Sequence, residues 1–304
     1  MELSPDFAFR PLPAIQDETQ QPFPQVASPF GPLAPLAGKW AGRGFNVIWR
    51  PDHAPGQDHF LELNLTSDQI EFSDIPGPIP NRGLLQPDIN MFGLTYLNQI
   101  SDANVGAGLH IEPGIWAAVP ATTDPKVVPT VCRLASIPHG TVVLLQGTAV
   151  TTNGGPNIAV KGIKPFGIGG PPTSTIDFPE QTLTNPTNFR TSGAGLTGIT
   201  QQMVNNPNSV LTAAIAGQHI TSTTTLHVTT IDLPTPGGGT ANTAFLKGGA
   251  DGPNATAVQV TATFWLETLQ GQSAPTQLQY TQTVLLNFNG ISWPHVTVAT
   301  LHKQ

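Results

Sequence analysis

His295 is the residue whose position in this sequence says most about chemistry. It lies in the closing stretch 292–303, which reads as a β-strand, and the two-residue period of a strand places it on one face with Trp293, Thr297 and Ala299. If this strand closes a barrel, that face points inward. A neutral imidazole there can bind a metal through Nε2 while a carbonyl or water holds Nδ1–H. We therefore expect either the axial ligand of a haem iron or a structural histidine.

A haem group would also need an apolar slot around this histidine. A planar porphyrin requires small residues near the iron and bulky residues at its edge. The predicted strands supply side chains of both kinds: Thr297, Ala299, Leu61, Leu63, Phe264 and Leu266.

A second candidate is the pair His110 and Glu112. Two residues apart on a strand, they point to the same side and could offer a metal an imidazole and a carboxylate. Further histidines at set spacings would be needed to complete such a site, and we find none. The alternative is a partly buried histidine that the neighbouring carboxylate holds by hydrogen bonding.

Two Asp-His pairs, Asp52-His53 and Asp58-His59, flank Pro55-Gly56. A loop of this composition could bind a hard or borderline metal. Loops rich in Asp, His, Gly and Pro are usually solvated turns, however. Both interpretations stay open.

Other chemistry is poorly supported by the sequence. Ser292 lies three residues before His295, but no G-x-S-x-G nucleophile motif is present. Cys132 lies in an apolar strand and is expected to be an inert core thiol. The glycine-rich stretch 167–172 has no helix start after it, so it does not indicate a phosphate site.

The composition favours a turn-rich β protein. Charged residues make up 10% of the 304 residues, against about 25% in an average soluble domain. The chain has 31 glycines and 31 prolines, which argues against a helical bundle and for many strands joined by turns. Hydrophobic residues, at 38%, can still fill a sizeable core.

Charge and hydropathy exclude several classes of partner. The net charge of −7 and the lack of a Lys/Arg run argue against nucleic acid as a partner, because phosphate binding needs a basic face. We find no basic amphipathic helix, no run of 18 apolar residues and no secretory signal at the N-terminus, so we expect no membrane association. A single cysteine cannot form an intrachain disulfide. A cytoplasmic protein is the resulting expectation.

Alternating apolar residues predict a series of short strands. The clearest is 60–66, in which Leu61, Leu63 and Leu65 share one face. Asn289-Gly290 is a strong signal for a two-residue hairpin turn. The expected strands are 39–49, 60–66, 69–72, 94–101, 108–119, 130–137, 141–150, 221–233, 256–269, 277–288 and 291–301. We interpret them as an all-β, roughly ten-stranded, antiparallel up-and-down barrel.

Two regions fall outside the barrel pattern. Residues 1–36 contain eight prolines and little periodicity, which predicts an extended arm. Residues from about 154 to 250 interrupt a single barrel domain of residues 37–303, with glycine- and proline-rich loops and short helices near 197–206 and 209–217. The arm and the low charge density make a homodimer plausible.

Three segments resemble strands of nitrobindins, which are ten-stranded haem-binding barrels similar in shape to fatty-acid-binding proteins and lipocalins. Gly38, Trp40, Gly42 and Gly44 resemble the opening G-x-W-x-G-x-G strand. Residues 109–116 resemble a central H-x-E-x-G-aromatic strand. Residues 293–303 resemble the closing strand with its haem-ligating histidine. The three segments cover about 40 residues and occur in the same order as in the family.

The resemblance implies a b-type haem (iron) bound by His295, with His110, Trp40 and Thr297 in the cofactor site. It also implies an open iron position for nitric oxide, peroxide or peroxynitrite, and therefore possible peroxynitrite isomerase or peroxidase activity. This chain is about twice the length of the family domain. A haem-free, lipocalin-like carrier of an apolar small molecule and a haem enzyme of specialised metabolism are the alternatives.

Overall fold

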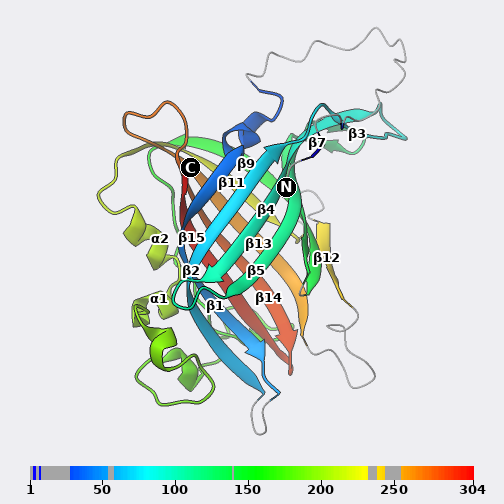
Figure 1. Ribbon diagram of the computed structural model, residues 1–304. Helices are drawn as coiled ribbons and strands as arrows, with labels where there is room; N and C mark the ends of the chain where they lie inside the picture. The colour runs from blue at the N-terminus through cyan, green and yellow to red at the C-terminus, as the bar shows by residue number, and fades with distance from the viewer. Residues whose placement is uncertain are drawn as a thin grey trace.

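The computed structural model describes residues 3–4, 7, 28–53, 58–138, 140–231, 238–243 and 255–304. Ten long strands follow one another around a closed antiparallel barrel (Figure 1). They are β1 (Gly38–Pro51), β2 (His59–Asp74), β4 (Ile89–Asp102), β5 (Gly108–Val119), β8 (Thr130–Ile137), β9 (Thr141–Asn153), β11 (Ile220–Thr229), β13 (Thr256–Leu269), β14 (Gln277–Phe288) and β15 (Ile291–Lys303). The expected all-β barrel is confirmed.

The first and last strands close the barrel. β1 pairs with β15 from Trp40 opposite Lys303 to Val47 opposite Val296. The β14–β15 hairpin turns at Asn289 and Gly290, whose φ angles of 50° and 74° are both positive. Two positive φ values match the strand twist in a two-residue turn, so the hairpin predicted from Asn-Gly is confirmed.

β2 is one long strand where the sequence suggested two. Asp68, an unfavourable residue for a strand interior, separates the predicted segments. It continues the alternation because its carboxylate points into the barrel, where the Tyr280 hydroxyl donates to Oδ2 at 2.5 Å. Its side chain is fully buried.

A short 3-10 helix closes one end of the barrel. η1 (Gly31–Leu36) inserts Leu33 and Leu36, both fully buried, into the interior core. Trp40 Nε1 donates to the carbonyl of Leu36 at 2.7 Å, and the Lys303 ammonium lies 5.3 Å from the Trp40 ring centroid. Residues 31–36 were expected to be part of an extended arm, but they form this helix instead. Residues 8–27 of the expected arm lie outside the described residues.

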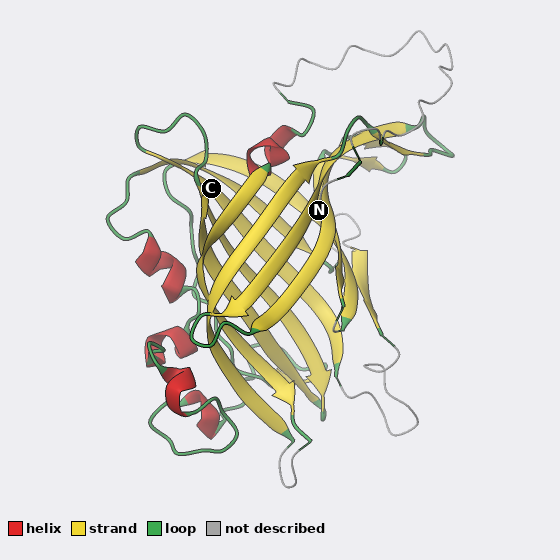
Figure 2. Cartoon of the chain, in the orientation of Figure 1, coloured by secondary structure: helices red, strands yellow, loops and turns green. Residues whose placement is uncertain are grey.

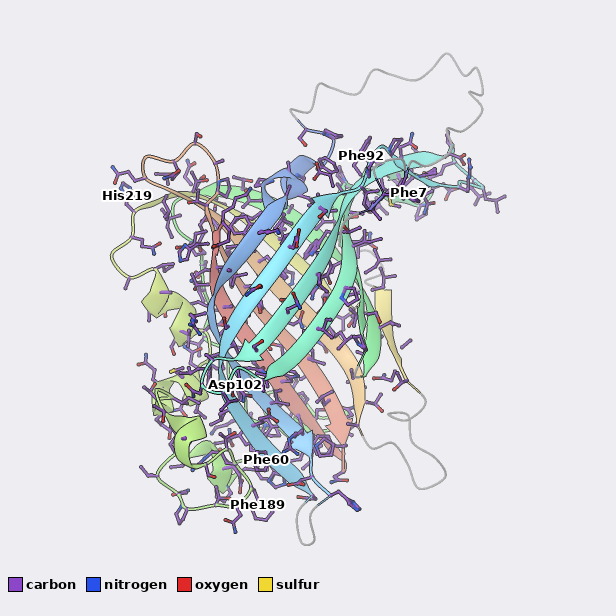
Figure 3. The ribbon with its side chains drawn as sticks, in the orientation of Figure 1. Phe7, Phe60, Phe92, Asp102, Phe189 and His219 are labelled. Carbon is purple, nitrogen blue, oxygen red and sulfur yellow. The ribbon has the colours of Figure 1, made fainter. Side chains whose placement is uncertain are left out.

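The connection between β9 and β11, residues 154–219, covers part of the outer wall. It contains β10 (Phe166–Gly167), η2 (Pro179–Gln181), η3 (Gly193–Leu196), α1 (Gln201–Asn205) and α2 (Ser209–Ala214), whose helices lie along one side of the barrel in Figure 2. A backbone hydrogen bond joins this connection to β2: Leu61 N–H donates to the carbonyl of Phe189 at 2.8 Å. Figure 3 shows Phe60 and Phe189 at the end of the molecule opposite η1.

The inserted region is two connections instead of one. β11 belongs to the barrel, so the expected insertion at about 154–250 divides into 154–219 and a second connection that precedes β13. The second connection contains β12 (Gly238–Asn242), which pairs with the first half of β9 beyond the end of β11.

Three minor strands complete the described structure. They are β3 (Ile79–Asn81), β6 (Thr122–Thr123) and β7 (Lys126–Val127). No helix among the described residues is long and apolar enough to cross a membrane.

Candidate functional site

The barrel interior changes from apolar to polar along its axis. Near η1 the inward side chains form an apolar core that includes Trp40, Leu94 and Trp116. Past this core, carboxylates, amides and two histidines point inward from several strands. At that end His110 and His295 are only half-buried, although both lie on inward faces. The end opposite η1 is therefore the part of the interior that solvent reaches.

His295 is held by two neutral side chains. Its Nε2 lies 3.0 Å from Asn46 Oδ1, and the Thr297 hydroxyl donates to the same oxygen at 2.9 Å. An amide oxygen only accepts, so Nε2 carries the ring proton in this arrangement. The cross-strand partner on β14 is the apolar Val284. Strand β15 thus presents to the interior an imidazole whose Nε2–H is donated to Asn46.

His110 belongs to a buried charged network centred on Glu112. The fully buried carboxylate of Glu112 pairs with the guanidinium of Arg133 and accepts from the Tyr96 hydroxyl. Arg133 also donates to Tyr96 at 2.9 Å and to Gln282 at 2.7 Å. His110 Nε2 lies 3.1 Å from the second carboxylate oxygen. All polar atoms of the Glu112 carboxylate are therefore engaged by protein groups.

Electrostatics in this network follow from burial and pairing. Burial opposes ionisation of Glu112, but the Arg133 charge and the His110 hydrogen bond outweigh it and lower the pKa of Glu112 to about 2. Burial raises the pKa of Tyr96 well above its usual value. In this geometry His110 is a partly buried histidine that the neighbouring Glu112 carboxylate holds by hydrogen bonding, which was one of the two interpretations of the sequence. Among the described residues, no group of three or more His, Cys, Asp or Glu side chains could hold a metal ion.

A second buried acid, Asp68, lies in the same polar region. Burial raises the pKa of Asp68 to about 6, although hydrogen bonds from Thr66 and Tyr280 act in the opposite direction. Sequence reasoning missed Asp68, Arg133 and both tyrosines. A usable signal was Arg133 itself, a charged residue on the same face of an otherwise apolar strand as Val131 and Ala135.

Several predicted slot residues lie away from His295. Leu61 and Leu63 point outward and pack beneath the 154–219 connection. Phe264 and Leu266 point inward but belong to the apolar core. Trp40 pairs with Lys303, eight residues along β15 from His295, which is roughly 26 Å at the usual strand rise. Of the proposed site residues, the structure joins His295 to Thr297, places His110 in the same half of the interior, and separates Trp40.

The remaining candidates have structural surroundings. His59 Nδ1 lies 2.5 Å from Asp58 Oδ1, and its ring stacks on Trp293 at 5.1 Å between centroids. Ser292 donates to Asn287 Oδ1 at 2.7 Å. Burial raises the pKa of Cys132 to about 11, which agrees with an inert thiol.

Fold and site together define a closed ten-stranded antiparallel barrel with one end plugged and two inward histidines towards the other. No family model matches the chain, and no curated protein matches it. Among solved structures, the crystal structure of Rv2717c from M. tuberculosis is similar over 92% of this chain and 99% of that one. The sequence identity is 15% and the TM-score 0.43.

Proposed function

We propose that this protein binds a small molecule inside its barrel, and that the molecule is haem b held by His295. The observation that carries the proposal is the half-buried, inward imidazole of His295 in the solvent-accessible half of the interior. Its Nε2 contacts the uncharged side chains of Asn46 and Thr297, and an imidazole binds iron in its neutral form.

The surrounding side chains fit a haem site in their chemistry. Arg133 and Glu112 compensate each other, so the polar region adds no uncompensated charge from this pair. Val284 beside His295 supplies apolar surface. The Nε2–H bond to Asn46 has to break, and the proton has to move to Nδ1 or leave, before Nε2 can bind a metal.

His110 is the second residue of the proposed site. β5 lies four strands from β15 around the barrel, so His110 and His295 project from different parts of the wall. We assign His110 to the distal or propionate side of the haem, as the nitrobindin resemblance implies. Bound haem would supply an iron for nitric oxide, peroxide or peroxynitrite; His295 would hold it and the barrel wall would limit access of water.

A second candidate function is favoured by the same hydrogen bond. With Nε2–H donated to Asn46, His295 is satisfied without a metal. The barrel would then be a haem-free carrier of an apolar small molecule, and His295 would be one polar group of its interior.

Titration with hemin separates the two functions. We expect a Soret band on titrating the full chain, with His295→Ala weakening or abolishing it. His302→Ala is the matched control, because His302 is an exposed residue of the same strand. No change in the hemin spectrum on adding the native protein would favour the haem-free carrier. A Soret band that is unchanged in His295→Ala would remove His295 as the ligand.

A further inference from the structure

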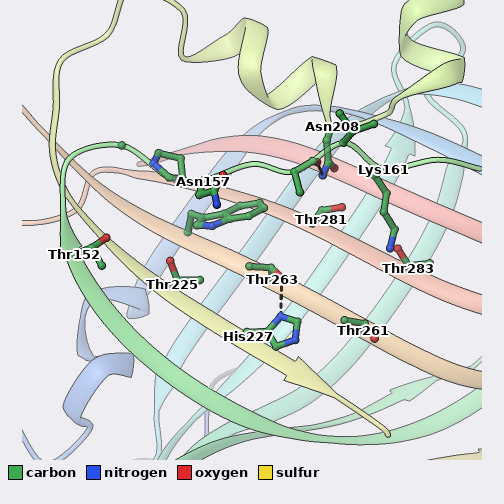
Figure 4. Close-up of a pocket in the computed structure, with 15 residues that line it drawn as sticks. Thr152, Asn157, Lys161, Asn208, Thr225, His227, Thr261, Thr263, Thr281 and Thr283 are labelled. Carbon is green, nitrogen blue, oxygen red and sulfur yellow. Dashed lines mark hydrogen bonds between the residues drawn. The ribbon is translucent and has the colours of Figure 1, made fainter. Parts of the chain in front are cut away.

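A separate pocket of about 540 Å³ lies on the outer wall of the barrel (Figure 4). Its floor is formed by outward residues of β11, β13 and β14, and its roof by residues 155–161 and Asn208 of the 154–219 connection. Leu226, Phe264 and Tyr280 of the same strands point into the barrel. Because side chains alternate along a strand, the pocket is on the opposite side of the wall from His295 and is independent of the proposed haem site.

The lining is rich in hydroxyl groups and contains no acidic residue. Threonine is a normal outward residue on strands, where water usually solvates its hydroxyl. Here the 154–219 connection lies beside six threonines, and together they line a pocket that is partly open to solvent. The threonines are Thr152, Thr225, Thr261, Thr263, Thr281 and Thr283.

Two groups that can carry positive charge line the same pocket. Lys161 is half-buried, and Figure 4 shows its side chain extending to the wall beside Thr283. No carboxylate of the described residues lies within ion-pair distance of Lys161, whereas Lys164 pairs with Asp177 at 2.5 Å. His227 Nδ1 lies 2.9 Å from the Thr263 hydroxyl. Burial lowers the pKa of both Lys161 and His227, as expected for cations without a counter-charge.

Two buried polar oxygens of the lining residues have no hydrogen-bond partner among the described residues. Asn208 is 4% exposed; its Nδ2 donates to the carbonyl of Ala159 at 2.8 Å, while its Oδ1 has no partner among the described residues. The Thr281 hydroxyl is also buried without a partner there. Both oxygens are covered by protein atoms, so neighbouring side chains would have to move before a ligand hydroxyl could reach them. Trp265, 5% exposed, adds an apolar surface.

We propose that this pocket binds a small polyhydroxylated anion, namely a sugar acid or a sugar phosphate. Lys161 pairs with the anionic group, and His227 and the threonines hydrogen-bond to the oxygens. The volume lies within the usual range for small-molecule sites, about 300–1,000 Å³.

Isothermal titration calorimetry with D-gluconate, glucose 6-phosphate and D-glucose tests this proposal. We expect at least one anion to bind about tenfold or more tightly than neutral glucose, because a hydrogen bond to a charged group is stronger than one between neutral groups. The two anions distinguish a carboxylate site from a phosphate site. Binding of neither anion, or equal binding of glucose, would overturn the proposal.

Variants of the pocket complete the test. Lys161→Gln should weaken the anion about tenfold, while Lys164→Gln, which removes a neighbouring lysine outside the lining, should leave it unchanged. Thr283→Val keeps the shape and removes a hydroxyl of the lining beside Lys161, so the fold should persist and affinity should fall several-fold. Unchanged affinity in both pocket variants would refute the site; His295→Ala should not affect it.

Discussion

The hydrogen bond between His295 and Asn46 decides what the imidazole can do. While Nε2–H is donated to Asn46, the ring is a satisfied polar group of the interior. Once that bond is lost and the proton has moved, the same atom can bind iron. In the haem account Asn46 therefore competes with the metal for Nε2.

This competition predicts the effect of Asn46→Ala. Removing the amide should increase hemin affinity about 2- to 10-fold, because an internal hydrogen bond contributes about 0.5–1.5 kcal/mol net. Hemin titration followed at the Soret band measures it. Asn64→Ala is the control, since Asn64 is the cross-strand neighbour of Asn46 and bonds to Asp102 instead. Equal or weaker hemin binding by Asn46→Ala would contradict the competition.

Asp68 predicts a pH dependence of stability. Its pKa in the folded protein is about 6, above the usual value of 3.8, so the folded state holds the proton more tightly than the unfolded state. This contribution to stability is complete below about pH 4 and is lost as pH rises through 6. Relative to Asp68→Asn, the native protein should lose about 1 kcal/mol of unfolding free energy between pH 5 and pH 7.5. Urea unfolding at both pH values measures this; equal losses in the two proteins would show that the pKa is not raised.

At the scale of elements, β4, β5 and β8 are tied together by the Glu112–Arg133–Tyr96 network. Arg133→Met leaves the Glu112 carboxylate buried without its counter-charge and should cost about 3–5 kcal/mol of unfolding free energy. The double variant Arg133→Met with Glu112→Gln removes both charges and should recover much of that loss. Denaturant titration of both variants tests the coupling, and additive losses would disprove it.

Much of the barrel was predictable from local patterns. The eleven strand segments expected from the sequence fall in the ten barrel strands, two of them in β2, and Asn289-Gly290 identified the last hairpin, because each signal depends on residues close in the chain. The inward position of His295 followed from the same period and the core positions of Ala299 and Leu301.

The environment of the site was not predictable in the same way. Leu61 and Leu63 form a regular apolar face, but it packs under the 154–219 connection and not inside the barrel. Both faces of β2 are buried, so hydrophobicity alone cannot say which one is interior. The contact of Asn46 with His295 joins residues 249 positions apart and depends on barrel closure. No local pattern encodes it.

At the scale of the whole molecule, one wall separates two proposed sites. η1 and Trp40 close one end of the interior, the two histidines lie towards the other, and the outer pocket depends on the 154–219 connection. Homodimer formation and cytoplasmic localisation stay predictions from the sequence. The two sites can be tested separately, because the strand residues that line the outer pocket point outward and His295 points inward.

Chemical rescue tests the assignment of His295 to haem iron most directly. His295→Gly removes the ligand and leaves space for a free imidazole in the wall of β15. We predict that the hemin-loaded variant lacks the absorption spectrum of the native complex and that added imidazole restores it. A native spectrum from His295→Gly without imidazole would show that another residue holds the iron, and would contradict the central claim.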